Sequence, residues 1–113
     1  MIKEEVEKRL GQLQGWTLVD DKMEKNYKLA DFKQAVEFIN KIADIAEAEN
    51  HHPDILLWGW NNVKLTLTTH AVKGLSKHDF VLASKIDSEV KSGTRIGFAN
   101  ERVRALKNQD SAS

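Results

Sequence analysis

The sequence predicts an α+β domain in which four antiparallel strands form one sheet and three helices pack on one face of it. Three observations support this prediction. First, apolar residues recur at helical spacing in three stretches. Second, two other stretches show the alternation of apolar and polar residues that is typical of β-strands. Third, turn-forming residues interrupt each of these two alternating stretches. The alternating stretches lie between the helical ones, so the expected order is α-β-β-α-β-β-α. A length of 113 residues suits one such two-layer domain.

The first helix is expected over residues 2–12, where Ile2, Val6 and Leu10 recur among charged side chains. A glycine near its end, Gly11, favours termination there. The next stretch, residues 16–29, alternates around the turn-forming Asp20-Asp21-Lys22 and predicts a β-hairpin.

The second helix begins after Asp31, a good N-cap residue, and Gln34 completes a capping-box pattern. The helix is expected to run to about Glu49. Its apolar stripe contains Phe32, Ala35, Val36, Ile39, Ile42, Ala43 and Ala46, widened by Phe38 and Ile45. A stripe that covers about half of the circumference has two interpretations. The helix is either set deeply in the core or part of a subunit interface.

A second hairpin is expected from the runs 55–60 and 63–69, with its turn at Asn61-Asn62, because asparagine tolerates a positive φ. In its second strand Val63, Leu65 and Leu67 share the core face. Alternation puts His70 on the opposite, polar face.

The third helix follows Ser76-x-x-Asp79, an N-terminal capping pattern. Its expected inner stripe is Phe80, Ala83, Ile86, Asp87 and Val90. These elements form a single domain over residues 1–92. Residues 93–113 are expected to be a C-terminal tail that is partly helical or disordered.

Composition excludes several classes of function. Lys+Arg and Asp+Glu both number 17, so the formal net charge is zero, which argues against direct nucleic-acid binding. There is no cysteine, no apolar leader at the N-terminus and no run of about 18 apolar residues that would span a membrane. A cytoplasmic location is therefore expected, with neither nucleic acid nor membrane as a partner.

Three of the four histidines are candidates for proton transfer, because histidine is the side chain whose ordinary pKa lies near neutral pH. They are His51 and His52, which precede the only proline, Pro53, and His70. Surface or capping roles are an open alternative for each of them. A zinc site that includes Glu47 is another alternative, although the local spacing is not that of a chelating pair. The fourth histidine, His78, is given no role.

The order of the motifs resembles the pterin-4a-carbinolamine dehydratase family. The matching pattern is Glu47-x-x-x-His51-His52-Pro53, Val63, and Thr69-His70-x-x-x-Gly74-Leu75-Ser76-x-x-Asp79-x-x-x-Ala83. The resemblance implies dehydration of a 4a-hydroxytetrahydropterin to the quinonoid dihydropterin, without a metal or other cofactor. This reaction would support recycling of the pterin cofactor of aromatic amino-acid hydroxylases.

The resemblance also implies site residues and partners. The expected catalytic residues are His51, His52 and His70, and the expected substrate-binding residues are Glu47, Pro53, Thr69 and Asp79. His51 and His70 would form the acid/base pair, since a positioned histidine can donate or accept a proton at neutral pH. Besides its pterin substrate, the chain is expected to form a homodimer or homotetramer. As an alternative function, a helix face would bind a protein partner, in the way that animal members serve as dimerisation cofactors of a transcription factor.

One feature departs from the best-known members of that family. Between Pro53 and Val63 the chain has one residue more, within residues 55–60. An extra residue in a strand shifts the side chains to the other face or forms a β-bulge, and Gly59 would accommodate a bulge. The expected consequence falls on the pocket wall and the pairing of the sheet edge more than on the histidines.

Overall fold

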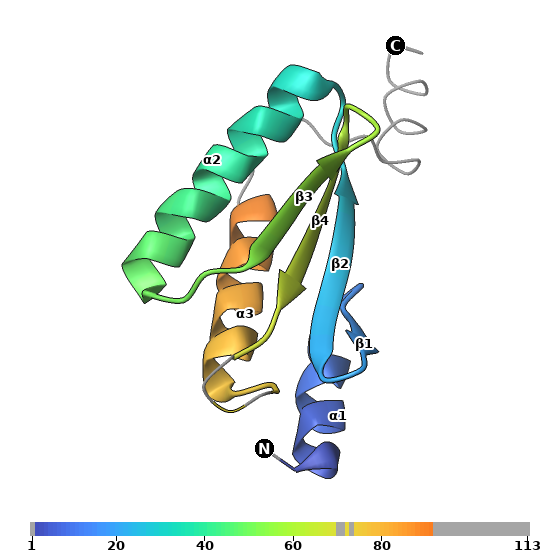
Figure 1. Ribbon diagram of the computed structural model, residues 1–113, viewed down its shortest axis with the longest axis vertical. Coiled ribbons are helices and arrows are strands. Elements are labelled where there is room, and N and C mark those ends of the chain that lie inside the picture. The colour runs from blue at the N-terminus through green and yellow to red at the C-terminus, as the bar shows by residue number, and fades with distance from the viewer. Residues whose placement is uncertain (1, 70–71, 73, 92–113) are drawn as a thin grey trace.

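The computed structural model of the chain describes residues 2–69, 72 and 74–91, and the fold is assembled from these (Figure 1). The elements are α1 (Lys3–Gly11), β1 (Thr17–Val19), β2 (Lys22–Lys28), α2 (Phe32–Glu49), β3 (Asp54–Trp58), β4 (Asn62–Leu67) and α3 (Lys77–Lys91). The predicted order is confirmed. His70 and the expected tail at residues 93–113 lie outside the described residues.

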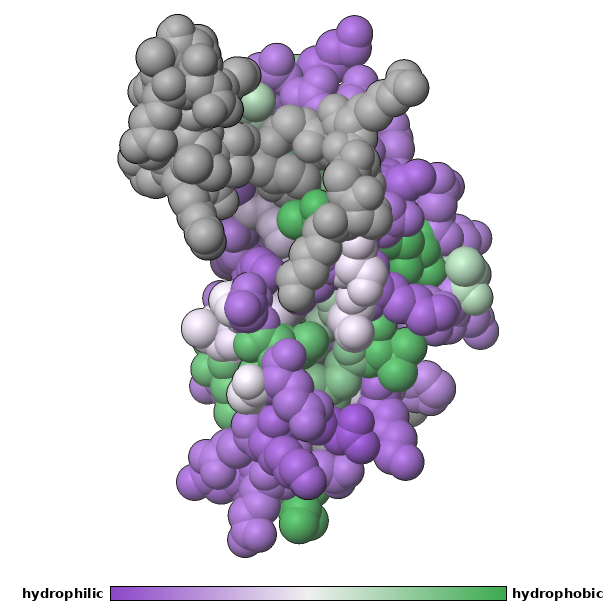
Figure 2. Space-filling model, turned by 180° about the vertical axis from the view of Figure 1, so that it is seen from behind, coloured by the Kyte–Doolittle hydropathy of each residue, from purple (hydrophilic) through white to green (hydrophobic). Residues whose placement is uncertain are grey.

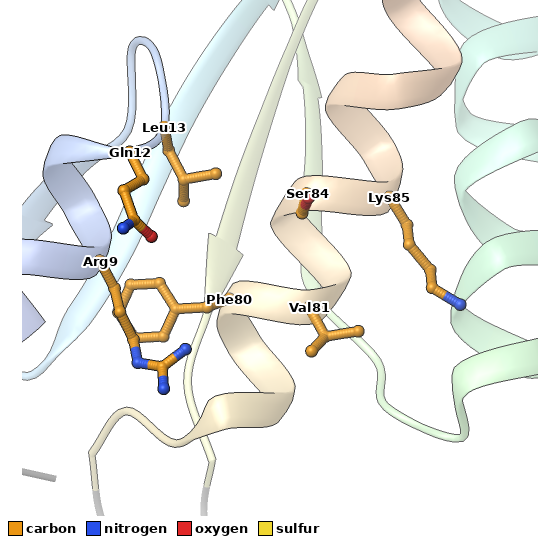
Figure 3. A pocket seen from close by; sticks show the side chains of 7 residues that line it. All are labelled: Arg9, Gln12, Leu13, Phe80, Val81, Ser84 and Lys85. Carbon is orange, nitrogen blue, oxygen red and sulfur yellow. The ribbon is translucent and has the colours of Figure 1, made fainter.

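The four strands form one antiparallel sheet in the order β1-β2-β4-β3. Two hairpins, β1–β2 and β3–β4, are joined by the pairing of their longer strands, β2 and β4. The helices cover one face of this sheet, and α3 lies between α1 and α2 (Figures 1 and 3). The predicted α+β architecture is thus confirmed.

The core lies between the sheet and the helices. Strand alternation turns one set of side chains inward, and Val63, Leu65 and Leu67 of β4 have no exposed surface. The same cluster contains Val6, Trp16, Met23, Tyr27, Leu29, Ala35, Phe38, Ile42, Leu75, Phe80, Leu82, Ala83 and Ile86. Burying one large apolar side chain contributes roughly 1.5–3 kcal/mol, so the continuous cluster is the main source of stability.

Helix α2 begins as predicted, because the Asp31 side chain accepts a hydrogen bond of 2.8 Å from the backbone N–H of Gln34. Its apolar stripe is divided. Residues along one line face the core, and Phe38 is 2% exposed. Along a neighbouring line Phe32 is 55% exposed and Val36 is 37% exposed. The helix rests on the sheet and α3 along one side only, so it is not the deeply set core helix of the first interpretation.

The turn between β3 and β4 comprises residues 59–61, so the prediction of a turn at Asn61-Asn62 is right for Asn61 and wrong for Asn62. Gly59 and Trp60 have φ of 54° and 59°, whereas Asn62 already belongs to β4. Asn61 is 4% exposed, and its side-chain amide donates to the carbonyl oxygen of Leu29 at 2.9 Å. Asparagine serves here as a buried link to the end of β2, and its tolerance of positive φ is not used.

The β3–β4 pairing is continuous from Asp54–Thr66 to Trp58–Asn62, so no bulge interrupts it. The positive-φ residues of this segment lie in the turn. Of the two outcomes considered for the extra residue, the bulge is not found in β3, because a turn accommodates irregular backbone without breaking ladder hydrogen bonds.

A polar cluster joins α3 to β2. The carboxylate of Asp87 accepts hydrogen bonds from Trp16 Nε1 at 2.9 Å, Lys25 Nζ at 3.0 Å and Tyr27 Oη at 2.7 Å. Burial, and then the nearby negative charge of Asp87, raises the pKa of Tyr27. Asp87 was expected on the inner stripe of the third helix, and the structure shows that it faces inward because three donors meet it there.

Candidate active site

The C-terminus of α2 positions His51. Asn50 adopts the left-handed conformation, with φ 52° and ψ 40°, and ends the helix. The backbone N–H of His51 then bonds back to the carbonyl oxygen of Ala46 at 3.1 Å, as in a Schellman motif. The chain leaves α2 at a defined angle, and His51 reaches the first turn of α3.

A short hydrogen bond holds the His51 ring against α3. His51 Nε2 lies 2.6 Å from Oδ1 of Asp79, whose side chain is 0% exposed, whereas the His51 side chain is 15% exposed. Asp79 lies in the first turn of α3, where the helix dipole stabilises a carboxylate. The arrangement therefore leaves the outer part of the His51 ring accessible to a ligand.

The second oxygen of Asp79 is also engaged. Oδ2 accepts from Thr69 Oγ1 at 2.7 Å and from the backbone N–H of Ser76 at 2.9 Å. The Thr69 and Ser76 hydroxyl oxygens are 2.7 Å apart, and Thr69 has only one hydroxyl proton. Thr69 gives that proton to Asp79, so Ser76 must donate to Thr69.

This network has a consequence for the tautomer of His51. An ionised carboxylate only accepts hydrogen bonds, so Nε2 of His51 carries the proton that points at Asp79. When the ring is neutral, its Nδ1 is then an unprotonated acceptor. A fixed imidazole whose other ring nitrogen has no hydrogen-bond partner among the described residues can take a proton from a ligand and return one.

A second pair lies nearby at the surface. His52 Nε2 is 2.5 Å from Oε2 of Glu47, and the two side chains are 57% and 77% exposed. Such an exposed pair contributes little to stability, so its geometry is adjustable. Pro53 follows at once and is half-buried.

The structure thus divides the predicted site residues. His51, Thr69 and Asp79 share one hydrogen-bond network, and Glu47 and His52 form a separate pair. The carboxylate of Asp79 is buried and engaged with three protein donors, so it lies behind His51, and its part in substrate binding stays a prediction.

Sequence reasoning missed two residues near the His51–Asp79 pair. Ser76 was assigned only a capping role, yet its hydroxyl also orients Thr69. His78 was assigned none, yet its ring centroid lies 5.9 Å from that of His51. The Ser76-x-x-Asp79 spacing was the available signal, because a capping box brings these side chains to the same helix end.

A cavity also lies elsewhere in the fold. It has a volume of about 330 Å³, lies between α1 and α3 and is lined by Arg9, Gln12, Leu13, Phe80, Val81, Ser84 and Lys85 (Figure 3). Its charged side chains already have partners, since Arg9 pairs with Glu5 and Lys85 reaches away to Glu49 on α2. Hydrophobic side chains gather at mid-height on the face seen from behind (Figure 2). The residues that line the cavity include none of the candidate histidines.

Within the described ranges, no group of three His, Cys, Asp or Glu side chains is arranged to hold a metal ion. His70 is not part of those ranges. Among the helices that the structure describes, none has the length and apolar character that a membrane span requires.

Comparison with known proteins assigns the family. The sequence profile described as pterin 4 alpha carbinolamine dehydratase matches residues 1–89. The chain is 41% identical over 91 residues to pterin-4-alpha-carbinolamine dehydratase 2, mitochondrial, of Arabidopsis thaliana, covering 77% of this chain and 49% of that protein. It is 46% identical over 87 residues to a Herpetosiphon aurantiacus protein named for the same dehydratase, covering 77% and 90%. The chain therefore spans about half of the plant relative but most of the bacterial one.

Comparison with solved structures supports the same family assignment. A protein from Brucella melitensis, described as a transcriptional coactivator/pterin dehydratase, has a TM-score of 0.73 and 31% identity, covering 78% of this chain and 95% of that one. A pterin dehydratase-like protein described as a RuBisCO assembly factor in the alpha-carboxysome has a TM-score of 0.53 at 19% identity, which shows a shared fold alone. The chain belongs to the pterin-4-alpha-carbinolamine dehydratase family, a family of hydro-lyases.

Proposed function

We propose that this chain dehydrates a 4a-hydroxytetrahydropterin to the quinonoid dihydropterin. The reaction removes the hydroxyl group of the carbinol carbon together with the proton of the adjacent ring nitrogen, and it releases one water. A general acid protonates the departing oxygen, and a general base takes the N–H proton. No electron is gained or lost, so two proton-transfer groups suffice.

The observation that carries the proposal is the pair formed by His51 and the buried Asp79. Their 2.6 Å contact fixes the ring and its tautomer, so that Nδ1 is available to a ligand. Each positioned acid or base contributes typically 10²–10⁴-fold to a rate. His51 and His70 are the proposed acid/base pair. His52, oriented by Glu47, is proposed to bind the pterin, with Pro53 and Thr69 beside it.

Turnover of 4a-hydroxytetrahydropterin by the purified chain tests the proposal. His51→Ala and His70→Ala should each slow dehydration by roughly 10²-fold or more while the protein stays folded. His52→Ala should raise KM more than it lowers kcat, because its pair with Glu47 is exposed and adjustable. A folded His51→Ala variant that turns over at the rate of the unsubstituted chain would refute the assignment.

A second candidate function, binding of a protein partner, has one specific observation in its favour. One line of side chains on α2 is apolar and includes Phe32, Val36 and Ala43. These side chains stay exposed in the part of the chain that the structure describes. Self-association into a dimer or tetramer would cover the same line. Normal turnover together with loss of assembly in a Phe32→Glu variant would assign this surface to association and not to catalysis.

The cellular location stays a prediction. We propose the cytoplasm, while the name of the plant relative places that protein in the mitochondrion. Fractionation of cells that express the tagged full chain distinguishes the two.

A further inference from the structure

His78 is a histidine beside His51 that the proposed dehydration does not use. Its backbone N–H donates to Ser76 Oγ at 3.3 Å, which fixes it in the first turn of α3. Its ring centroid lies 5.9 Å from the ring centroid of His51, and the two planes are tilted by 41°. His78 is exposed, whereas Asp79 holds His51 from the buried side. His78 therefore approaches His51 from the solvent side.

The charged and titratable groups near His51 in the part of the chain that the structure describes come from α3 and from the end of α2. In the first turn of α3 they are Lys77, His78 and Asp79, and further along α3 Lys85 pairs with Glu49 of α2. At the end of α2 and in the segment after it they are Glu47 and His52, which pair with each other at 2.5 Å. In the segment after β4, Thr69 donates to Asp79 and carries no charge. Asp79 is committed to three donors, so His78 is the imidazole of α3 that faces His51 from the solvent side.

We propose that His78 is a positioning residue that sets the pH range in which His51 works. A protonated His78 disfavours a second positive charge on His51. The limb of the pH profile that His51 controls then moves to lower pH, whether His51 acts as acid or as base. Two unit charges about 6 Å apart in high-dielectric surroundings shift such a limb by roughly half a pH unit, or about threefold in rate on the limb. This inference rests on the proposed function.

Two substitutions of His78 test whether its charge is what acts on His51. His78→Arg keeps a positive charge at every pH, and His78→Gln carries none. We expect the limb of the kcat/KM profile to lie at lower pH in the Arg variant than in the Gln variant, with the unsubstituted chain between the two. Lys77→Gln is the matched control, because it removes one exposed positive charge from the same helical turn. It should move the limb less than His78→Gln.

A second measurement is independent of turnover. NMR titration of the His51 ring in the three proteins should give a midpoint that is lowest with Arg and highest with Gln. If the unsubstituted chain has no dehydratase activity, the proposed function fails, yet this shift is still expected. The role of His78 is overturned if the Arg and Gln variants have the same limb in the kcat/KM profile and the same NMR midpoint for His51. It is also overturned if Lys77→Gln moves the limb as far as His78→Gln does.

Discussion

Replacing Asp79 by asparagine tests how the network controls His51. The substitution keeps the shape of the side chain but exchanges one acceptor oxygen for an NH₂ donor. The backbone N–H of Ser76 is a fixed donor at 2.9 Å, so the amide oxygen must stay on its side. The NH₂ group then faces His51 Nε2 and requires it to be an acceptor. The His51 proton moves to Nδ1, and the nitrogen available to the pterin changes from acceptor to donor.

The expected effect on catalysis is large and the effect on stability is ordinary. A histidine in the wrong tautomer costs about 10⁴-fold in kcat in the serine-protease triad, and loss of one acid or base costs typically 10²–10⁴-fold. We therefore expect Asp79→Asn to lower kcat by at least roughly 10²-fold. Losing one hydrogen bond to a charged group should lower the free energy of unfolding by about 1.5–3 kcal/mol.

The chain offers a matched control in Asp87→Asn. Asp87 lies two turns further along α3 and also accepts from three donors, so its substitution should cost a similar amount of stability. Its partners are Trp16, Lys25 and Tyr27, none of which contacts a histidine of the site in the described structure. Asp87→Asn should leave kcat nearly unchanged.

Steady-state dehydration assays give kcat for both variants, and urea denaturation gives their free energies of unfolding. The reasoning requires similar losses of stability and very different losses of kcat. If folded Asp79→Asn is no slower than folded Asp87→Asn, then Asp79 only caps α3, and the tautomer of His51 is not controlled by it.

Four further predictions follow from single features. Burial and Asp87 raise the pKa of Tyr27, so the stability that this group contributes is present below about pH 10 and is lost at higher pH. Tyr27 is the only tyrosine, so phenolate absorbance should rise together with unfolding; a rise in the folded protein near pH 10 would contradict this. Trp60→Asn should raise the free energy of unfolding by about 0.5–1 kcal/mol in urea, because Trp60 is exposed and has a φ of 59°; a loss of stability would argue against strain there. Light scattering should give a dimer or tetramer mass that Phe32→Glu reduces, and a monomer mass for the unsubstituted chain would refute the predicted assembly. Elemental analysis should find no stoichiometric metal and chelators should leave turnover intact; one bound metal per chain, with activity lost on its removal, would overturn metal-free catalysis.

Local signals in the sequence determined the elements and their order. Helical spacing, strand alternation and the Asp31 and Ser76-x-x-Asp79 caps depend on residues within a few positions of one another, so they can be read without knowing the fold. The family resemblance brought together the candidate residues from separate parts of the chain. Neither source gave the full extent of the β3–β4 turn, and the long-range contact of Asn61 with Leu29 decided the role of that asparagine.

Tertiary structure alone decided how the candidate residues work together. The contact between His51 and Asp79 spans 28 positions of the chain, and no periodicity encodes it. The exposed half of the α2 stripe became visible only when the sheet and α3 covered the other half. The approach of His78 to His51 arose because the end of α2 meets the start of α3. Burial and charge proximity are properties of the packed chain, and they determine that His51 is held by a buried carboxylate whereas His52 and His78 lie at the surface.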